Sequence, residues 1–297
     1  MNNTAIAASG LRKAFGDKNV LDGVGFEVPT GTVFSLLGPN GAGKTTAVNI
    51  LTTLMRADAG TVRVAGHDVA TQAKAVRAAI GVTGQFAAVD ELLTGRENLA
   101  LMADLKRVRP AGPLVNGLLE RFDLAAAADK LASTYSGGMR RKLDLAMTLV
   151  GNPQVIFLDE PTTGLDPRSR RTMWDIVRDL VADGATIFLT TQYLEEADQL
   201  AHRVAVLDHG HIVAQGTPGQ LKRQLPGTHV RLRFTAPAEL DAAARVLPGA
   251  SRDDENLTLN VPGDGGTASL RALLDRLDEY ALVAAEFSVH TPDLDDV

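Results

Sequence analysis

Apolar residues along the chain gather in short runs that alternate with stretches of helical spacing. Apolar runs at 33–37, 155–158 and 185–189 each end at polar residues, and each predicts a buried strand. After the first run and a glycine-rich turn, apolar residues in "AVNILTTLM" (47–55) recur at the spacing of one helix face. Strand, turn and helix following one another in this way predict an α/β fold.

The middle of the chain reads as helical. "ELLTGRENLALMADL" (91–105) and "AGPLVNGLLERFDL" (111–124) carry apolar residues on one helical face and are separated by a Pro/Gly break. Farther on, His209 and Gly210 form a turn between two strands of alternating pattern, which predicts a hairpin.

The character of the chain changes near Pro226 and Gly227. "HVRLRF" (229–234) and "NLTLNV" (256–261) alternate apolar and polar residues, whereas the leucines of "ASLRALLDRLDEY" (268–280) share one helical face. This pattern predicts a small β-α-β-α-β domain at 228–297, after a larger domain at 1–225. Its His229 and His290 are interpreted as surface or strand residues and not as ligands.

Composition narrows the class of protein. The 297 residues carry a net charge of −6 and no cysteine, which excludes disulfides and thiolate metal sites and argues against broad binding to nucleic acid. No apolar run approaches the roughly 18 residues needed to span a bilayer, and the N-terminus lacks the apolar region of a secretory signal. We therefore expect a cytosolic protein whose role at a membrane, if it has one, requires a partner chain.

The turn "GPNGAGKTT" carries the strongest chemical signal. Gly38, Gly41 and Gly43 leave the backbone open, so that successive N–H groups and the helix N-terminus can surround phosphates. Lys44 is placed to reach the β- and γ-phosphates, and the Thr45 hydroxyl is a suitable oxygen ligand for Mg²⁺. These residues predict a nucleotide-binding P-loop.

Two carboxylates follow the apolar run "VIFL". Adjacent residues of a strand point to opposite sides, so Asp159 and Glu160 can have different roles. We expect Asp159 to hold Mg²⁺, directly or through water, and Glu160 to polarise the attacking water as base or orienter.

A third motif, "YSGGM", helps to decide which of the many classes of P-loop protein this chain belongs to. Ser136 can cap the helix that follows, and Gly137 and Gly138 allow a group to approach that helix end closely. A second phosphate-facing helix end is redundant beside a P-loop, unless it serves a nucleotide held by another copy of the chain. A helix cap without a ligand is the alternative.

Together these motifs resemble the ATP-binding subunits of ABC transporters over about residues 4–225. "GPNGAGKTT" is similar to the Walker A motif, "YSGGM" to the signature motif, "VIFLDEP" to Walker B, "TGLD" to the D-loop and "VTGQ" to the Q-loop. The resemblance implies a P-loop NTPase domain of α/β class with an antiparallel β subdomain and a helical subdomain at about 86–145. It also implies a small α+β C-terminal domain.

The resemblance also implies the residues of the site. Lys44, Glu160 and Gln192 would act in catalysis, and Thr45, Gln85 and Asp159 would bind Mg²⁺. The expected ATP contacts are Phe15, which matches the aromatic that stacks on adenine, together with Gly38, Pro39, Asn40, Gly41, Ala42, Gly43, Lys44, Thr45, Thr46, Gln85, Ser136, Gly137, Gly138 and Asp166.

Residue 192 departs from the family pattern. The family usually has a histidine there that contacts the γ-phosphate, and glutamine can make the hydrogen bonds of a neutral imidazole without its titration. "TTQYLEEADQL" resembles bacterial drug and natural-product export ATPases similar to daunorubicin-resistance proteins. The alternative is that Gln192 caps a helix from Tyr193 to Leu200 and contacts no phosphate.

The resemblance implies a motor that hydrolyses ATP to drive efflux of a hydrophobic drug or natural product. Two copies would pair head to tail, with Ser136 and Gly138 on the γ-phosphate bound by the other copy. The pair would act on a separate transmembrane permease, peripheral to the cytoplasmic face of the membrane. Phe86, Leu92 and Leu93 are candidate permease contacts.

Other functions remain open at this point. A soluble ABC ATPase acting on ribosomes or DNA is one, although the chain has one P-loop and no long heptad stretch. A motor for lipid, polysaccharide or import is another, because the ATP chemistry would be the same. For the C-terminal domain we expect a role in stabilising the dimer or in regulation.

Overall fold

The computed structural model describes residues 4–85, 88–224, 229–263 and 266–290. The chain divides into two compact units, Met1–Pro218 and Gly219–Val297. Within the described residues, two hydrophobic clusters belong to the first unit and a third, from Val230 to Leu277, belongs to the second. The predicted change of character at Pro226 and Gly227 lies outside the described residues.

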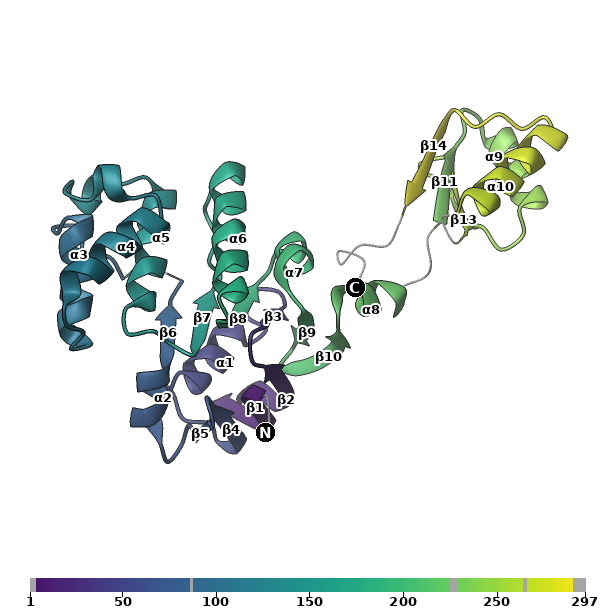
Figure 1. Ribbon diagram of the computed structural model, residues 1–297. Coiled ribbons are helices and arrows are strands. Elements are labelled where there is room, and N and C mark those ends of the chain that lie inside the picture. Colours follow the sequence, from purple (N-terminus) through teal and green to yellow (C-terminus); the bar gives the residue numbers. More distant parts are fainter. Residues whose placement is uncertain (1–3, 86–87, 225–228, 264–265, 291–297) are drawn as a thin grey trace. The chain divides into compact units, whose positions relative to one another are not determined.

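The first unit is built on a six-stranded sheet in the order β10-β9-β3-β8-β7-β6 (Figure 1). All neighbours in it are parallel except β9 and β10, which form the hairpin predicted at His209 and Gly210. The three strands expected from apolar runs are present. The strands of this sheet are β3 (Val33–Leu37), β6 (Ile80–Thr83), β7 (Val155–Asp159), β8 (Thr186–Thr191), β9 (Arg203–Asp208) and β10 (His211–Gly216).

Side chains on the two faces of this sheet belong to different parts of the core. In β7, Ile156 and Leu158 pack in the cluster that includes α5 (Gly137–Leu149) and α6 (Pro167–Ala182). Val155 and Phe157 alternate with them and pack in the cluster on the opposite face. Because helices or a second sheet cover both faces, the strand is apolar throughout instead of alternating.

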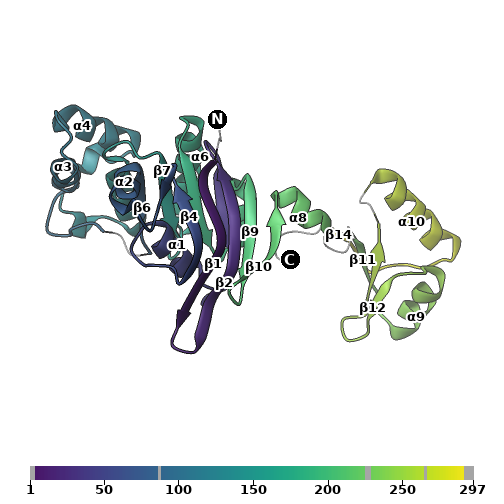
Figure 2. The ribbon, with the colours of Figure 1, turned by 90° about the horizontal axis from the view of Figure 1, so that it is seen from below.

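The opposite face is covered by α1 (Lys44–Leu51) and by an antiparallel sheet in the order β2-β1-β4-β5. Figure 2 shows β1 and β2 as the long paired ribbons of this layer. Its strands are β1 (Thr4–Phe15), β2 (Lys18–Pro29), β4 (Ala59–Val64) and β5 (His67–Asp68), and α2 (Ala73–Ala79) follows β5. This layer is the antiparallel β subdomain expected from the family resemblance.

A group of helices gathers beyond the β6 end of the large sheet (Figure 1). It consists of α3 (Gly95–Leu105), α4 (Ala111–Arg121) and α5, joined by two short 3₁₀ turns. The first helix begins at Gly95 and not near 91, because Thr94 and Glu97 form a capping box that fixes its N-terminus. These helices form a helical layer of the kind that the family resemblance implies.

The second unit contains a four-stranded antiparallel sheet in the order β12-β13-β11-β14. Its core is formed mainly by β11, β13 and two helices, with Val230, Leu232, Leu240 and Leu259 buried. Its elements are α8 (Pro218–Gln224), β11 (His229–Arg233), α9 (Pro237–Val246), β12 (Ser251–Asp253), β13 (Thr258–Pro262), α10 (Thr267–Glu279) and β14 (Glu286–His290).

The sequence pattern missed β12. The observed order is β-α-β-β-α-β, and the added strand is only three residues long and polar. Such a strand has no apolar alternation, and it is held by its ladder with β13. Within the described ranges, no helix has the length and apolarity needed to cross a membrane.

Candidate functional site: a P-loop and the residues around it

The P-loop connects the end of β3 to α1, as predicted, and its glycines are needed for different reasons. Gly41 has a φ of 83°, a left-handed conformation that glycine adopts without a steric penalty. A Cβ at Gly38 would lie 2.2 Å from the carbonyl oxygen of Leu207, and one at Gly43 would lie 2.7 Å from that of Val20. The loop is therefore packed against two other segments and also turned sharply.

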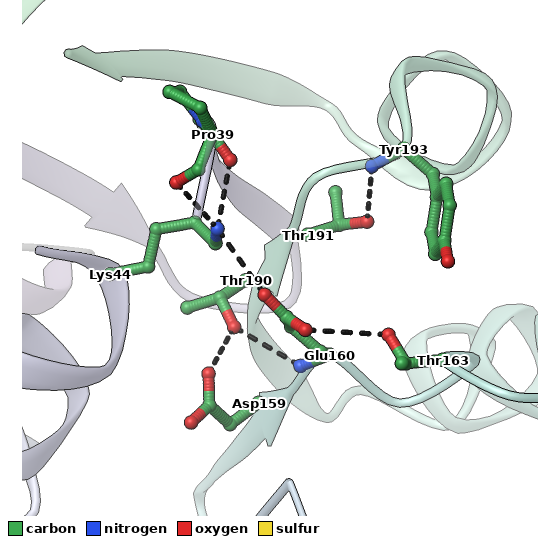
Figure 3. A network of polar contacts seen from close by, with 9 residues as sticks. Pro39, Lys44, Asp159, Glu160, Thr163, Thr190, Thr191 and Tyr193 are labelled. Carbon is green, nitrogen blue, oxygen red and sulfur yellow. Dashed lines mark hydrogen bonds and ion pairs between the residues drawn. The ribbon is translucent and has the colours of Figure 1, made fainter. Parts of the chain in front are cut away.

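Lys44 is almost fully buried, and its ammonium group contacts three oxygens. It donates to the carbonyl of Gly38 at 2.8 Å and that of Pro39 at 3.1 Å, and it pairs with Glu160 Oε1 at 3.2 Å (Figure 3). The predicted lysine and the predicted catalytic carboxylate are therefore in direct contact.

Thr190, at the end of β8, contacts both acidic residues of the Walker B segment, Asp159 through its carboxylate and Glu160 through its main-chain N–H. Its hydroxyl donates to Asp159 Oδ1, and the Glu160 N–H donates to the same hydroxyl at 3.1 Å (Figure 3). Thr163 adds a donor to Glu160 Oε2 at 3.3 Å. Thr190 belongs to no motif of its own, and the only signal for it in the sequence is its position one residue before the end of an apolar strand.

The different roles expected for the two carboxylates do not come from strand alternation. Asp159 is the last residue of β7, whereas Glu160 lies beyond the strand with a φ of 50°. A left-handed backbone at a residue other than glycine is unfavourable, and such residues concentrate at functional sites. This conformation directs the Glu160 side chain to Lys44.

A cavity of about 320 Å³ brings together much of the predicted site. It is lined by Val20, Asn40, Gly41, Gly43, Lys44, Thr45, Thr46, Gln85 and Glu160. Gln85 also lines a second cavity of about 340 Å³, with Gly137 of the signature motif and Gly164 of the D-loop. Gln85 thus lies between the P-loop cavity and the signature motif.

The residues expected to bind Mg²⁺ suit that ion chemically. Thr45 and Gln85 line the P-loop cavity with a hydroxyl and an amide oxygen, and Asp159 contributes a buried carboxylate. Hard oxygen donors of this kind are what Mg²⁺ prefers. Asp159 does not line the cavity, and Thr190 joins it to Glu160.

The signature motif caps α5, as predicted. The exposed Ser136 accepts a hydrogen bond from the N–H of Met139 at 3.2 Å. Gly138 packs so closely on α6 that a Cβ there would lie 2.8 Å from Ser169 Oγ. None of the signature residues lines the P-loop cavity of the same chain.

Asp166 of the D-loop acts as the N-cap of α6. Its carboxylate accepts hydrogen bonds from the N–H groups of Arg168 and Ser169 at 3.0 Å and from Ser169 Oγ at 2.6 Å. These bonds, the Ser169 hydroxyl first, lower the pKa of Asp166.

Gln192 lies one residue beyond β8, as expected, and is half-buried. The α7 helix (Leu194–Leu200) has its N-cap at Tyr193, with no hydrogen bond from a side chain to the cap. Thr191 instead accepts from the N–H of Tyr193 at 2.9 Å (Figure 3). The alternative in which Gln192 caps this helix is therefore wrong.

Phe15 ends β1 and is about half exposed, and the Lys13 ammonium lies 5.5 Å from its ring centroid. Phe15 does not line the P-loop cavity. Of the candidate permease contacts, Leu92 is 84% exposed and Leu93 is half-buried, whereas Phe86 lies outside the described residues.

Buried charged residues around the site were not singled out from the sequence. Arg141 and Asp144 form an ion pair inside the unit. Glu196 is fully buried, and its Oε1 accepts hydrogen bonds from Thr162 and Trp174. Burial raises the pKa of Glu196. None of these lies in a motif of its own, so only the fold connects them to the site.

This combination of sheet, P-loop, Walker B carboxylates and a separate signature helix defines a class of ATP-hydrolysing protein. A model of the ABC transporter family matches residues 21–163. The chain belongs to the ATP-binding proteins of ABC transporters, and it is an ATPase of the kind that drives transport.

Two curated relatives and one solved structure illustrate the similarity. The chain is 48% identical to the daunorubicin resistance ATP-binding protein DrrA3 of Streptomyces coeruleorubidus, over 100% of this chain and 95% of that one. It is 44% identical to the Nod factor export ATP-binding protein I of Paraburkholderia xenovorans, over 74% of this chain and 73% of that one. An ATP-binding cassette of an ABC transporter in its ADP conformation superposes with a TM-score of 0.66 at 27% identity, covering 73% of this chain and 92% of that one.

Proposed function

We propose that this chain is the motor subunit of an exporter that removes a hydrophobic drug or natural product. The observation that carries the proposal is the full-length match to daunorubicin-resistance proteins. The match to the Nod factor export protein covers only 74% of the chain. The second unit is therefore included in the similarity to the drug-resistance proteins, which favours a drug-like substrate over a Nod factor.

The chain would work as a head-to-tail pair. Ser136 and Gly137 are exposed and lie away from the P-loop cavity of their own chain. This arrangement supports a dimer in which the N-terminus of α5 meets the γ-phosphate held by the other copy. ATP would stabilise the pair because it binds both surfaces at once.

The P-loop and Walker B residues would divide the chemistry. The backbone around Gly41 and the Lys44 ammonium would hold the phosphates, and Glu160 would orient the attacking water. Thr45, Gln85 and Asp159 would hold Mg²⁺, which supplies positive charge that offsets the charge developing on the phosphates. Gln192 would donate its amide N–H to the γ-phosphate.

A separate permease would dock beside the helical subdomain, which places the chain peripherally at the cytoplasmic face of the membrane. An open, largely apolar cavity of about 340 Å³ lies there, with Leu54, Met102 and Met147 in its lining. Arg77 and Lys106 are exposed and also line it. A short amphipathic segment with acidic groups would suit such a surface.

Affinity purification from the native cell tests this proposal. We expect the tagged chain, after gentle solubilisation of the membranes, to co-purify with a stoichiometric protein of several membrane spans. Leu54→Arg should abolish this co-purification and leave ATP hydrolysis intact, because Leu54 is 71% exposed in the cavity lining.

Val213→Arg is the matched control, since Val213 is 61% exposed on β10 and is not part of that cavity. Recovery of the chain alone, or with ribosomes or DNA, would contradict the export function. The ATPase assignment would stand in that case.

A further inference from the structure

Arg141 lies one turn into the signature helix and is buried, with only 7% of its surface exposed. Its guanidinium group donates to three main-chain carbonyls from two other segments. Nε donates to the carbonyl of Pro161 at 2.9 Å, Nη2 to that of Asp159 at 3.2 Å, and Nη1 to that of Gly84 at 2.7 Å. Two of these carbonyls flank Glu160, and the third precedes Gln85.

Asp144, one turn farther along the same helix, completes the arrangement. It pairs with Arg141 Nη1 at 3.4 Å, and its Oδ1 accepts from the N–H of Ala88 at 3.0 Å. The loop that carries Gln85 is thus held on both sides, at Gly84 by the arginine and at Ala88 by the aspartate.

Burying these two charges opposes folding. Desolvation lowers the pKa of Arg141 and raises that of Asp144, although the neighbouring carboxylates of Asp144, Asp159 and Glu196 act against the shift at the arginine. A buried ion pair is often no more stabilising than apolar residues of similar volume. Stability alone therefore does not explain why a charged pair occupies this position.

We propose that Arg141 and Asp144 are positioning residues that couple the signature helix to the Gln85 loop and to Glu160. The inference rests on ATP hydrolysis at Glu160 and does not depend on the transported substrate. The N–H donors of the planar guanidinium have a fixed geometry. A displacement of one of the three carbonyls therefore alters the hydrogen bonds that Arg141 makes to the other two. A movement of α5 therefore reaches the loop before Gln85 and the main chain on both sides of Glu160.

The pair also reaches the surface proposed for the permease. Asp144 and Ala88 line the 340 Å³ cavity that includes Leu54. These two side chains thus connect the signature helix, the main chain around the hydrolytic carboxylate and the docking cavity. We call Arg141 and Asp144 the coupling unit. It would respond to a second copy of the chain at the signature helix and to a permease at the docking cavity.

Arg141→Gln in the full-length chain tests the coupling. The variant keeps an amide donor but cannot span three carbonyls, so kcat for ATP hydrolysis should fall about tenfold or more, with the dissociation constant for ATP changing less than about threefold. Arg141→Lys retains the charge without the fork and should behave in the same way.

Asp144→Asn should lower kcat as well, and the double variant R141Q/D144N should lose no more than R141Q alone, because the two residues act as one unit. Arg178→Gln is the matched control. Arg178 pairs with Asp175 at the same i, i+3 spacing but on the exposed face of α6, and this variant should hydrolyse ATP at the wild-type rate.

Two results would overturn the proposal. One is a turnover of R141Q or R141K within about twofold of the wild type. The other is a loss of turnover in R141Q and D144N that is matched by an equal loss of ATP affinity and a lower Tm, which would show that the pair only supports the fold.

Discussion

Gln192 follows β8 directly, two residues after Thr190, whose hydroxyl bonds the Asp159 carboxylate and the Glu160 main-chain N–H. Neutral glutamine can donate and accept hydrogen bonds, but it carries no charge at any pH at which the protein is folded. A histidine there would titrate near pH 6.5. Under the proposed contact with the γ-phosphate, the identity of residue 192 would affect both the rate of hydrolysis and its dependence on pH.

Gln192→Ala is expected to slow ATP hydrolysis about tenfold or more, because a donor to the transferring phosphoryl group is lost. ATP binding should stay nearly intact, since the P-loop supplies most contacts to the nucleotide. Steady-state hydrolysis and equilibrium binding of ATP measure the two effects separately.

Gln199→Ala, on the exposed face of α7, is the control. Gln192→His adds a second readout. The ratio of its rate to that of the wild type should change between about pH 6 and 7, as the imidazole titrates. A turnover of Gln192→Ala at the wild-type level, or a ratio independent of pH, would show that residue 192 does not contact the phosphate.

At the scale of elements, the N-termini of α5 and α6 lie against each other. Ser136 caps the first, Asp166 caps the second, and Gly138 is close enough to Ser169 to exclude any side chain. The signature motif and the D-loop therefore share one junction. A change at either cap should affect both helix ends.

The pH dependence of stability should report the Asp166 cap. Because its pKa is lowered in the folded chain, the charged carboxylate stabilises the fold above the unfolded pKa of about 3.9, and this contribution is lost as the pH falls through the folded value. Asp166→Asn keeps the cap geometry and removes the charge. Urea unfolding should show the wild type more stable than the variant at pH 7, with the difference shrinking as the pH falls below about 3.9.

Asp17→Asn, in the exposed turn between β1 and β2, is the matched control. Its effect on the free energy of unfolding should not show the pH dependence expected for Asp166→Asn. If the free energies of unfolding of the wild type and Asp166→Asn differ by the same amount at pH 7 and pH 3, the charge of Asp166 does not contribute to the cap.

The elements that local patterns encode were the ones predicted correctly. The P-loop, the Walker B strand and the Ser136 cap depend on residues close together in sequence, so apolar periodicity and motif spacing were enough. The contact between Arg141 and Gly84 joins residues 57 positions apart, and that between Lys44 and Glu160 joins two motifs. Such contacts appear only when the sheet brings the segments together.

Boundaries and backbone conformation were less predictable, for physical reasons. The strand β12 is three polar residues long and has no apolar pattern, and its ladder with β13 is a contact that only the fold creates. The left-handed backbone of Glu160 is accompanied by a hydrogen bond that its N–H donates to Thr190, a residue of another strand. Neither feature has a local signal in the sequence.

At the scale of the whole molecule, the two units have separate cores. The second unit buries Leu232, Leu240 and Leu273 among its own helices and strands. The residues that line the P-loop cavity in the described part of the chain, from Val20 to Glu160, belong to the first unit. For the second unit we propose a role in stabilising the dimer or in regulating it.

A chain truncated after Gly227 tests that role. We expect it to bind ATP with an affinity within about threefold of the full chain, because the P-loop cavity is complete in the first unit. Its ATP-driven dimerisation should be weaker, as measured by sedimentation over a range of concentrations. Unchanged dimerisation would remove the dimer-stabilising role, and a lower Tm of the first unit would show instead that the truncation damages the fold.

The contacts of Lys44 have one more consequence. An ammonium group has three N–H donors, and the carbonyls of Gly38 and Pro39 together with Glu160 occupy all of them. The lysine must give up a partner in order to bind a phosphate. If Glu160 orients the attacking water, as we propose, then binding of the triphosphate would also free its carboxylate, and substrate binding and activation of the hydrolytic group would be a single event.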